Sequence, residues 1–124
     1  MKKKRYLVIL VMAFIGLLLT LTACSKSTFG QMSERGNGIF SSYCRCHHSS
    51  SVGAPTLGIR LARNFQNAEQ IYDTIRTQMP YDLPGVLAAS EYQQVLSYIL
   101  VQNGYANAED MFDIEALSQI TLGE

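Results

Sequence analysis

Tryptophan is absent from this chain of 124 residues, and cysteine and proline occur only three times each. Basic residues become scarce once the first 23 positions are set aside, because six Lys and Arg then face ten Asp and Glu, a net charge of −4. An acidic chain is a poor partner for the phosphates of nucleic acid, so nucleic-acid binding is excluded as the expected function. The remaining 101 residues suffice for one domain. With no tryptophan and few long apolar runs, that domain would gain from an embedded cofactor.

The first 23 residues have the features of an export signal. Residues 1–5 are basic, residues 6–21 form an apolar run of 16, and small residues precede Cys24. A basic start, a short apolar stretch and a small-residue cleavage site are typical of a secretory signal, and the run is shorter than the roughly 20 residues of a membrane-spanning helix. The ending Leu-Thr-Ala-Cys also resembles the lipobox of bacterial lipoproteins. It implies cleavage before Cys24 and a lipid on the Cys24 sulfur.

An uncleaved anchor helix and a plain secreted protein are the alternatives to a lipoprotein. All three place the domain outside the cytoplasm, and the lipoprotein would be anchored to the bacterial cell membrane or to the outer membrane. The predicted organisation is a lipoprotein signal peptide over 1–23, a lipidated Cys24 with a polar tether over 24–32, and one domain over 33–124.

The predicted secondary structure is all-α. A first helix is expected from Ser33 as N-cap towards the cysteines, and a second from Asn67, whose side chain can cap it, to just before Pro80. A third is expected from Ser90 to about Gln102, and a short last helix begins near Asp113. In the third helix the apolar residues Tyr92, Val95, Leu96, Ile99 and Leu100 lie at i, i+3, i+4, i+7 and i+8, which is one apolar stripe. No segment predicts a strand.

The two cysteines that lipid does not use lie in the segment 43–48, Tyr-Cys-Arg-Cys-His-His. A disulfide between Cys44 and Cys46 would be strained, because bridged Cα atoms prefer a separation of about 5.5 Å. Two unmodified thiols outside the cell would be chemically exposed. Both facts favour covalent use of the sulfurs. The segment is one residue short of C-x-x-C-H, the attachment element of c-type haem, in which two thiols bond the porphyrin and the histidine ligates iron.

Residues around this segment resemble the monohaem class I cytochromes c. Gly36, Phe40 and Cys44 lie four apart, like the glycine, aromatic and first cysteine of that family's first helix, and residues four apart share a helix face. A glycine there lets another helix approach closely. In the family the approaching helix is the last one, and Tyr98 resembles its central aromatic. The resemblance therefore predicts that residues near Tyr98 cross the first helix at Gly36.

Two further segments resemble the same family, and together the resemblance covers residues 34–104 and extends over the tail to residue 122. Pro55-Thr56-Leu57 is similar to the family's Pro-x-Leu, whose proline carbonyl orients the axial histidine. Met79-Pro80, followed by the turn-rich residues 81–85, is similar to the loop that carries the axial methionine. An ordinary core methionine is the alternative reading of Met79, because Ile71, Ile75 and Met79 also form a stripe of helical spacing.

The resemblance implies a small class I cytochrome c fold, with three to five helices around one covalent haem c. It implies thioethers from Cys44 and Cys46 and iron ligation by Met79 and by one histidine. On a helix, residues i and i+2 are 200° apart, so both cysteines reach one haem only if the backbone between them is extended. Whether one cysteine or both form a thioether to the haem therefore stays open. His47 is favoured as the axial ligand because it keeps the Cys-His dipeptide, and His48, which keeps the usual spacing of four from Cys44, is the alternative.

The implied function is electron transfer and not catalysis, since His/Met ligation leaves iron no vacant position for a substrate. We expect a membrane-tethered cytochrome that passes single electrons between extracytoplasmic redox proteins, such as a dehydrogenase, an oxidase or another cytochrome. A second hypothesis is a metal-binding lipoprotein, in which the cysteines and histidines of 44–48 hold copper or zinc. A third is a cytochrome fold that has lost covalent haem and serves as an interaction module.

Overall fold

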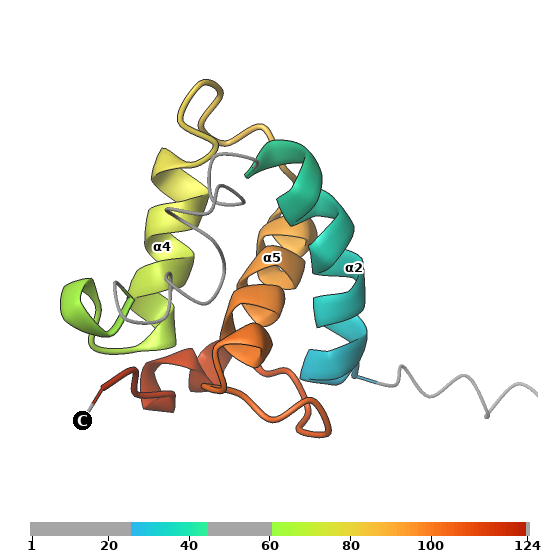
Figure 1. Ribbon diagram of the computed structural model, residues 1–124, viewed down its shortest axis with the longest axis vertical. Helices are drawn as coiled ribbons and strands as arrows, with labels where there is room; N and C mark the ends of the chain where they lie inside the picture. The colour runs from blue at the N-terminus through green and yellow to red at the C-terminus, as the bar shows by residue number, and fades with distance from the viewer. Residues whose placement is uncertain (1–25, 45–60, 124) are drawn as a thin grey trace, which may run out of the picture.

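The protein is all-α in the two ranges that the computed structural model describes, residues 26–44 and 61–123. The labelled elements are the α-helices α2 (Phe29–Tyr43), α4 (Ala68–Gln78) and α5 (Ala89–Gln102) and the 3₁₀-helix η2 (Ile114–Gln119), and residues 61–64 are helical as well. These ranges contain no strand, only the isolated bridges Thr28–Met111 and Asn67–Thr121. Helix α5 packs against both α2 and α4, and η2 packs against α4 (Figure 1). The predicted all-α class is confirmed.

Helix α2 begins five residues earlier than the sequence predicted. Its N-cap is Thr28, whose hydroxyl accepts a hydrogen bond from the Gln31 N–H at 3.2 Å, while the Gln31 side chain accepts one from the Thr28 N–H at 3.2 Å. This reciprocal pair is a capping box, which satisfies two amides that a helix start would otherwise leave unpaired. Ser33 therefore lies inside the helix. Phe29 and Met32, which the sequence had placed in the polar tether, are buried in the core.

Helix α4 has the bounds that the sequence predicted. Asn67 is its N-cap, and the Asn67 Oδ1 accepts a hydrogen bond from the Gln70 N–H at 3.1 Å. Ile71 and Tyr72 are buried against the core. The helix ends at Gln78, ahead of Pro80, because the residue before a proline is driven out of the helical region.

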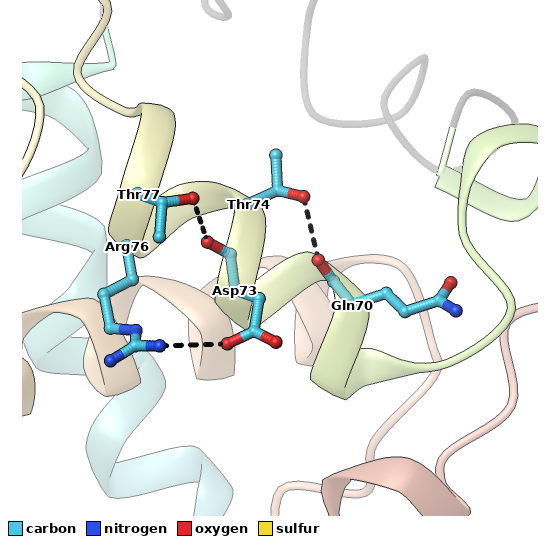
Figure 2. Close-up of polar contacts among 5 residues, drawn as sticks. All are labelled: Gln70, Asp73, Thr74, Arg76 and Thr77. Carbon is cyan, nitrogen blue, oxygen red and sulfur yellow. Dashed lines mark hydrogen bonds and ion pairs between the residues drawn. The ribbon is translucent and has the colours of Figure 1, made fainter.

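The outer face of α4 is polar (Figure 2). The Thr74 and Thr77 hydroxyls donate to the backbone carbonyls of Gln70 and Asp73, at 2.9 and 2.6 Å. Arg76 forms an ion pair with the Asp73 carboxylate at 3.2 Å, and both side chains are exposed. An exposed pair of this kind contributes little to stability. This face is solvated surface.

Helix α5 begins after Ala88 and not at Ser90. The N–H of Ala88 donates to the Glu91 carboxylate at 2.8 Å, and no N-cap side chain accepts from the first turn, so the cap expected from Ser90 is absent. The five residues of the predicted stripe, Tyr92, Val95, Leu96, Ile99 and Leu100, are all buried. The helix ends at Gln102 as predicted, and Gly104 has a φ of +75°, a conformation that favours glycine after a helix.

The segment after α5 runs across the N-terminal ends of α2 and α4. The first amides of these two helices donate to its carbonyls: Phe29 to Asp110 and Gly30 to Ala108, both at 2.9 Å, and Ala68 to Ile120 at 3.0 Å. Helix η2 follows Asp113, as the sequence predicted, and Leu117 from it is 1% exposed. The C-terminal segment therefore closes one end of the domain and leaves the other end to the loop between α4 and α5 (Figure 1).

Candidate functional site

Helices α2 and α5 touch backbone to backbone at Gly36. A Cβ built on Gly36 would lie 2.0 Å from the Gln94 carbonyl oxygen, 2.5 Å from the Gln94 carbonyl carbon and 3.0 Å from the Val95 nitrogen. Only glycine leaves room for a neighbouring backbone at this distance. The predicted crossing of the two helices at Gly36 is confirmed.

One turn beyond the crossing, Phe40 of α2 packs on Tyr98 of α5. The two ring centroids are 5.1 Å apart and the rings are tilted by 46°. This separation is typical of a favourable aromatic pair. The predicted pairing of Tyr98 with the first helix is thus confirmed, and the pair fixes how far α2 can rotate about its own axis.

Cys44 follows Phe40 by one further turn and is the C-cap residue of α2. Its backbone N–H donates to the Phe40 carbonyl at 2.8 Å, and its φ and ψ of −114° and 30° lie outside the helical region. The side chain is half-buried against the core. Helix α2 therefore presents Cys44 at its very end, and it does not extend into the rest of the cysteine motif.

Met79 is presented by the end of α4 in a similar way. It is the C-cap residue of that helix, and its backbone N–H donates to the Ile75 carbonyl at 3.2 Å. From α5, the Tyr92 hydroxyl donates to the Met79 carbonyl at 2.8 Å. Met79 is half-buried, so its thioether stays accessible to a group bound beside the core.

Cys44 and Met79 line the same pocket, although 35 positions separate them in the chain. The pocket has an empty volume of about 310 Å³, open solvent included. Its other walls come from α4, α5 and the loop between them: Ile75, Pro80, Leu87, Tyr92, Val95 and Ile99. A thiol and a thioether are soft ligands, and the walls around them are almost entirely apolar. The enclosed part of the pocket is small, about 30 Å³, so the described residues offer two sulfur side chains on an apolar surface.

Six of the eight pocket residues were not assigned to the site from sequence, among them Tyr92 and Leu87. Tyr92 was expected only as part of the buried stripe, and Leu87 was not singled out at all. A signal for Tyr92 was present, because a tyrosine at an inward position of a helix needs a partner for its hydroxyl. No comparable signal marked Leu87, because the fold of the loop alone brings it to the pocket.

The other residues assigned from the sequence lie outside the described residues: Cys24, Cys46, His47, His48, Pro55 and Leu57. Across residues 26–44 and 61–123, no group of three or more His, Cys, Asp or Glu side chains could hold a metal ion. Among the helices of these same ranges, none combines the length and the apolar character needed to cross a membrane.

The chain was also compared with known proteins. Neither protein-family models, nor curated proteins, nor solved structures gave a match.

Proposed function

We propose that the protein is a membrane-tethered monohaem cytochrome of the c type, which passes single electrons between extracytoplasmic redox proteins. The observation that carries the proposal is the shared pocket of Cys44 and Met79. Two sulfur side chains from the ends of different helices line it together with apolar residues. The crossing at Gly36 and the contact between Phe40 and Tyr98 support it, because they hold α2, which carries Cys44 at its end, against α5, which forms a wall of the same pocket.

Cys44 and Met79, the two residues of the expected haem-binding set that the structure describes, are compatible with a covalently bound haem. Cys44 would form one thioether, with Cys46 as the other or the sole one, and Met79 would ligate iron opposite His47, or His48 in the alternative frame. The haem supplies one-electron redox chemistry, and ligation by a thioether sulfur favours the reduced state. Ile75, Val95 and Ile99 form an apolar wall beside the two sulfurs. By excluding water, this wall also favours the reduced state, which carries less charge. It therefore acts in the same sense as the thioether ligand.

The surface beside the pocket suits a protein partner. Of the six large hydrophobic side chains that are exposed in the described ranges, four lie at the end of α2 or in the loop between α4 and α5: Tyr43, Tyr81, Leu83 and Val86. Tyr81 is 86% exposed and Leu83 62%. Grouped apolar side chains on a surface mark interaction sites. A redox partner would dock here through a small, transient interface next to the proposed haem edge.

The proposed lipid anchor lies at the other end of α2. Cys24 precedes the Thr28 N-cap by only four residues, whereas Cys44 follows the last residue of the helix. A helix of 15 residues separates the two, which at 1.5 Å per residue is roughly 22 Å. The haem would therefore be held away from the membrane surface, on the side where a water-soluble domain of a partner can reach it.

Intact mass and a pyridine haemochrome spectrum test the proposal. The full chain would be matured in a host with haem-attachment machinery, beside a Cys44→Ala/Cys46→Ala double variant as control. We expect the parent to gain the mass of one haem and to show Soret and α bands, and the double variant to show neither. A parent without these bands would overturn the proposal.

The same measurements on single variants determine how the shortened motif is used. If the frame of Cys46 and His47 alone is used, Cys44→Ala should be spectrally silent, while Cys46→Ala and His47→Ala should abolish stable attachment. If both thioethers form, each cysteine variant should keep haem on the other sulfur, with an α band shifted to the red. Loss of haem in His48→Ala, with His47→Ala like the parent, would assign the axial ligand to the other frame.

A copper or zinc lipoprotein is the second candidate. The pairing of the Cys44 thiol with the Met79 thioether favours it, because soft sulfur ligands select Cu(I). It leaves the close crossing at Gly36 and the aromatic pair of Phe40 and Tyr98 without a role. Stoichiometric copper or zinc in a purified chain that lacks haem bands would support this candidate over the cytochrome.

A further inference from the structure

We infer that Tyr92 is a positioning residue for Met79. Its hydroxyl holds the backbone carbonyl of Met79 and so determines where the thioether sulfur is presented. The inference rests on the proposed function, because it concerns the sulfur proposed as an iron ligand.

The hydrogen bond joins two elements across the pocket. The Tyr92 hydroxyl, from the first turns of α5, donates to the Met79 carbonyl at the end of α4 at 2.8 Å. Tyr92 is 3% exposed, and its side chain and that of Met79 line the same pocket. A phenylalanine would fill the same space, so packing alone does not account for the hydroxyl. Burying a hydroxyl is unfavourable unless it finds an acceptor, and here that acceptor is Met79.

The position of the Met79 sulfur depends mainly on the position of the Met79 backbone. A methionine side chain has three rotatable bonds, and its sulfur accepts hydrogen bonds only weakly. The Met79 backbone is extended, with φ and ψ of −124° and 151°, as the following Pro80 requires. The bond from its N–H to Ile75 fixes it to α4, and the bond from Tyr92 fixes its carbonyl to α5. Met79 is therefore held on both sides of its Cα.

Displacing the sulfur from iron would move the Met79 backbone away from α5 and break the bond to Tyr92. Removing the hydroxyl should then make displacement easier without removing the ring that lines the pocket. The variant that does this is Tyr92→Phe. Its matched control is Tyr98→Phe, which removes a hydroxyl from the same helix at a ring that packs on Phe40 instead.

Imidazole titration of the ferric, haem-loaded full chain measures this effect. Imidazole replaces a methionine ligand, and the loss of the charge-transfer band at the red end of the spectrum follows the replacement. We expect imidazole to bind about fivefold more tightly to Tyr92→Phe than to the parent, since the net value of one hydrogen bond, about 1 kcal/mol, no longer opposes displacement. Tyr98→Phe should bind imidazole like the parent.

Each other outcome has a distinct meaning. Unchanged imidazole affinity in Tyr92→Phe, with haem bound and the charge-transfer band present, overturns the inference and leaves the proposed function standing. A lower urea midpoint without a change in imidazole affinity assigns the hydroxyl to general stability and overturns it too. An equal change of imidazole affinity in Tyr98→Phe also overturns the inference. A parent without haem overturns the proposed function and the inference with it. A charge-transfer band that survives Met79→Ala overturns the assignment of Met79 as ligand and the inference, while the proposed function stands.

Discussion

Replacement of Gly36 by alanine tests the contact on which the whole site depends. Gly36 and Gly38 both lie in the middle of α2, but their surroundings differ completely. A Cβ at Gly36 would lie 2.0 Å from the Gln94 carbonyl oxygen, whereas a Cβ at Gly38 would meet no atom within 4 Å. The pair Gly36→Ala and Gly38→Ala therefore changes the same residue type in the same helix, with and without the clash.

The two substitutions should change the free energy of unfolding in opposite directions. Alanine in a helix interior is favoured over glycine by about 1 kcal/mol, so Gly38→Ala should stabilise the domain by roughly 0.5–1 kcal/mol. Gly36→Ala has the same gain but must separate α2 from α5, and overpacking of this kind costs about 1–3 kcal/mol. The atoms that oppose the new Cβ belong to the backbone of Gln94 and Val95, so no side chain can move aside. We therefore take the upper end of that range, which leaves a net loss of about 2 kcal/mol.

Urea unfolding followed by far-UV circular dichroism measures both changes. The two variants and the parent would be compared as full chains under identical conditions, with linear extrapolation to water. The expected difference between Gly36→Ala and Gly38→Ala is about 3 kcal/mol, well above the error of the extrapolation. Equal stability of the two variants would refute the close crossing of α2 and α5, and with it the reason for placing Cys44 opposite Met79.

Three further predictions address single residues. Met79→Ala in the haem-loaded chain should keep covalent haem and lower the midpoint potential by a substantial part of the ~0.8 V range that axial ligands command, as measured by redox titration; an unchanged potential would rule Met79 out as a ligand. Cys24→Ser should block lipid attachment, and a diacylglycerol label that persists on a normally processed variant would contradict this. Thr28→Ala should lower the free energy of unfolding by about 1 kcal/mol, because the Gln31 amide loses its acceptor. Ser41→Ala, on the exposed side of the same helix, should change it by less than about 0.5 kcal/mol, and an equal loss in both variants would show that Thr28 is not the cap.

The sequence by itself determined those features whose causes are local or periodic. The stripe from Tyr92 to Leu100 gave the buried face of α5, since residues at helical spacing share one side. Asn67 and Pro80 gave both ends of α4, because capping and the restriction before proline act within a few residues. The spacing of Gly36 and Phe40 predicted that both lie on one face of α2, and the resemblance to class I cytochromes c predicted that this face meets the helix of Tyr98.

The tertiary structure decided where α2 begins and what surrounds Met79. Thr28 and Ser33 are both good caps by residue type, and the carbonyls of the C-terminal segment favour the earlier start because they accept from the first amides after Thr28. Those carbonyls come from residues about 80 positions away, which no local pattern reports. The bond from Tyr92 to Met79, and the pocket that Met79 and Cys44 share, also depend on residues distant in the sequence. Each depends on two helices whose relative placement is set by the core, so a side chain's partner stays undetermined until the chain has packed.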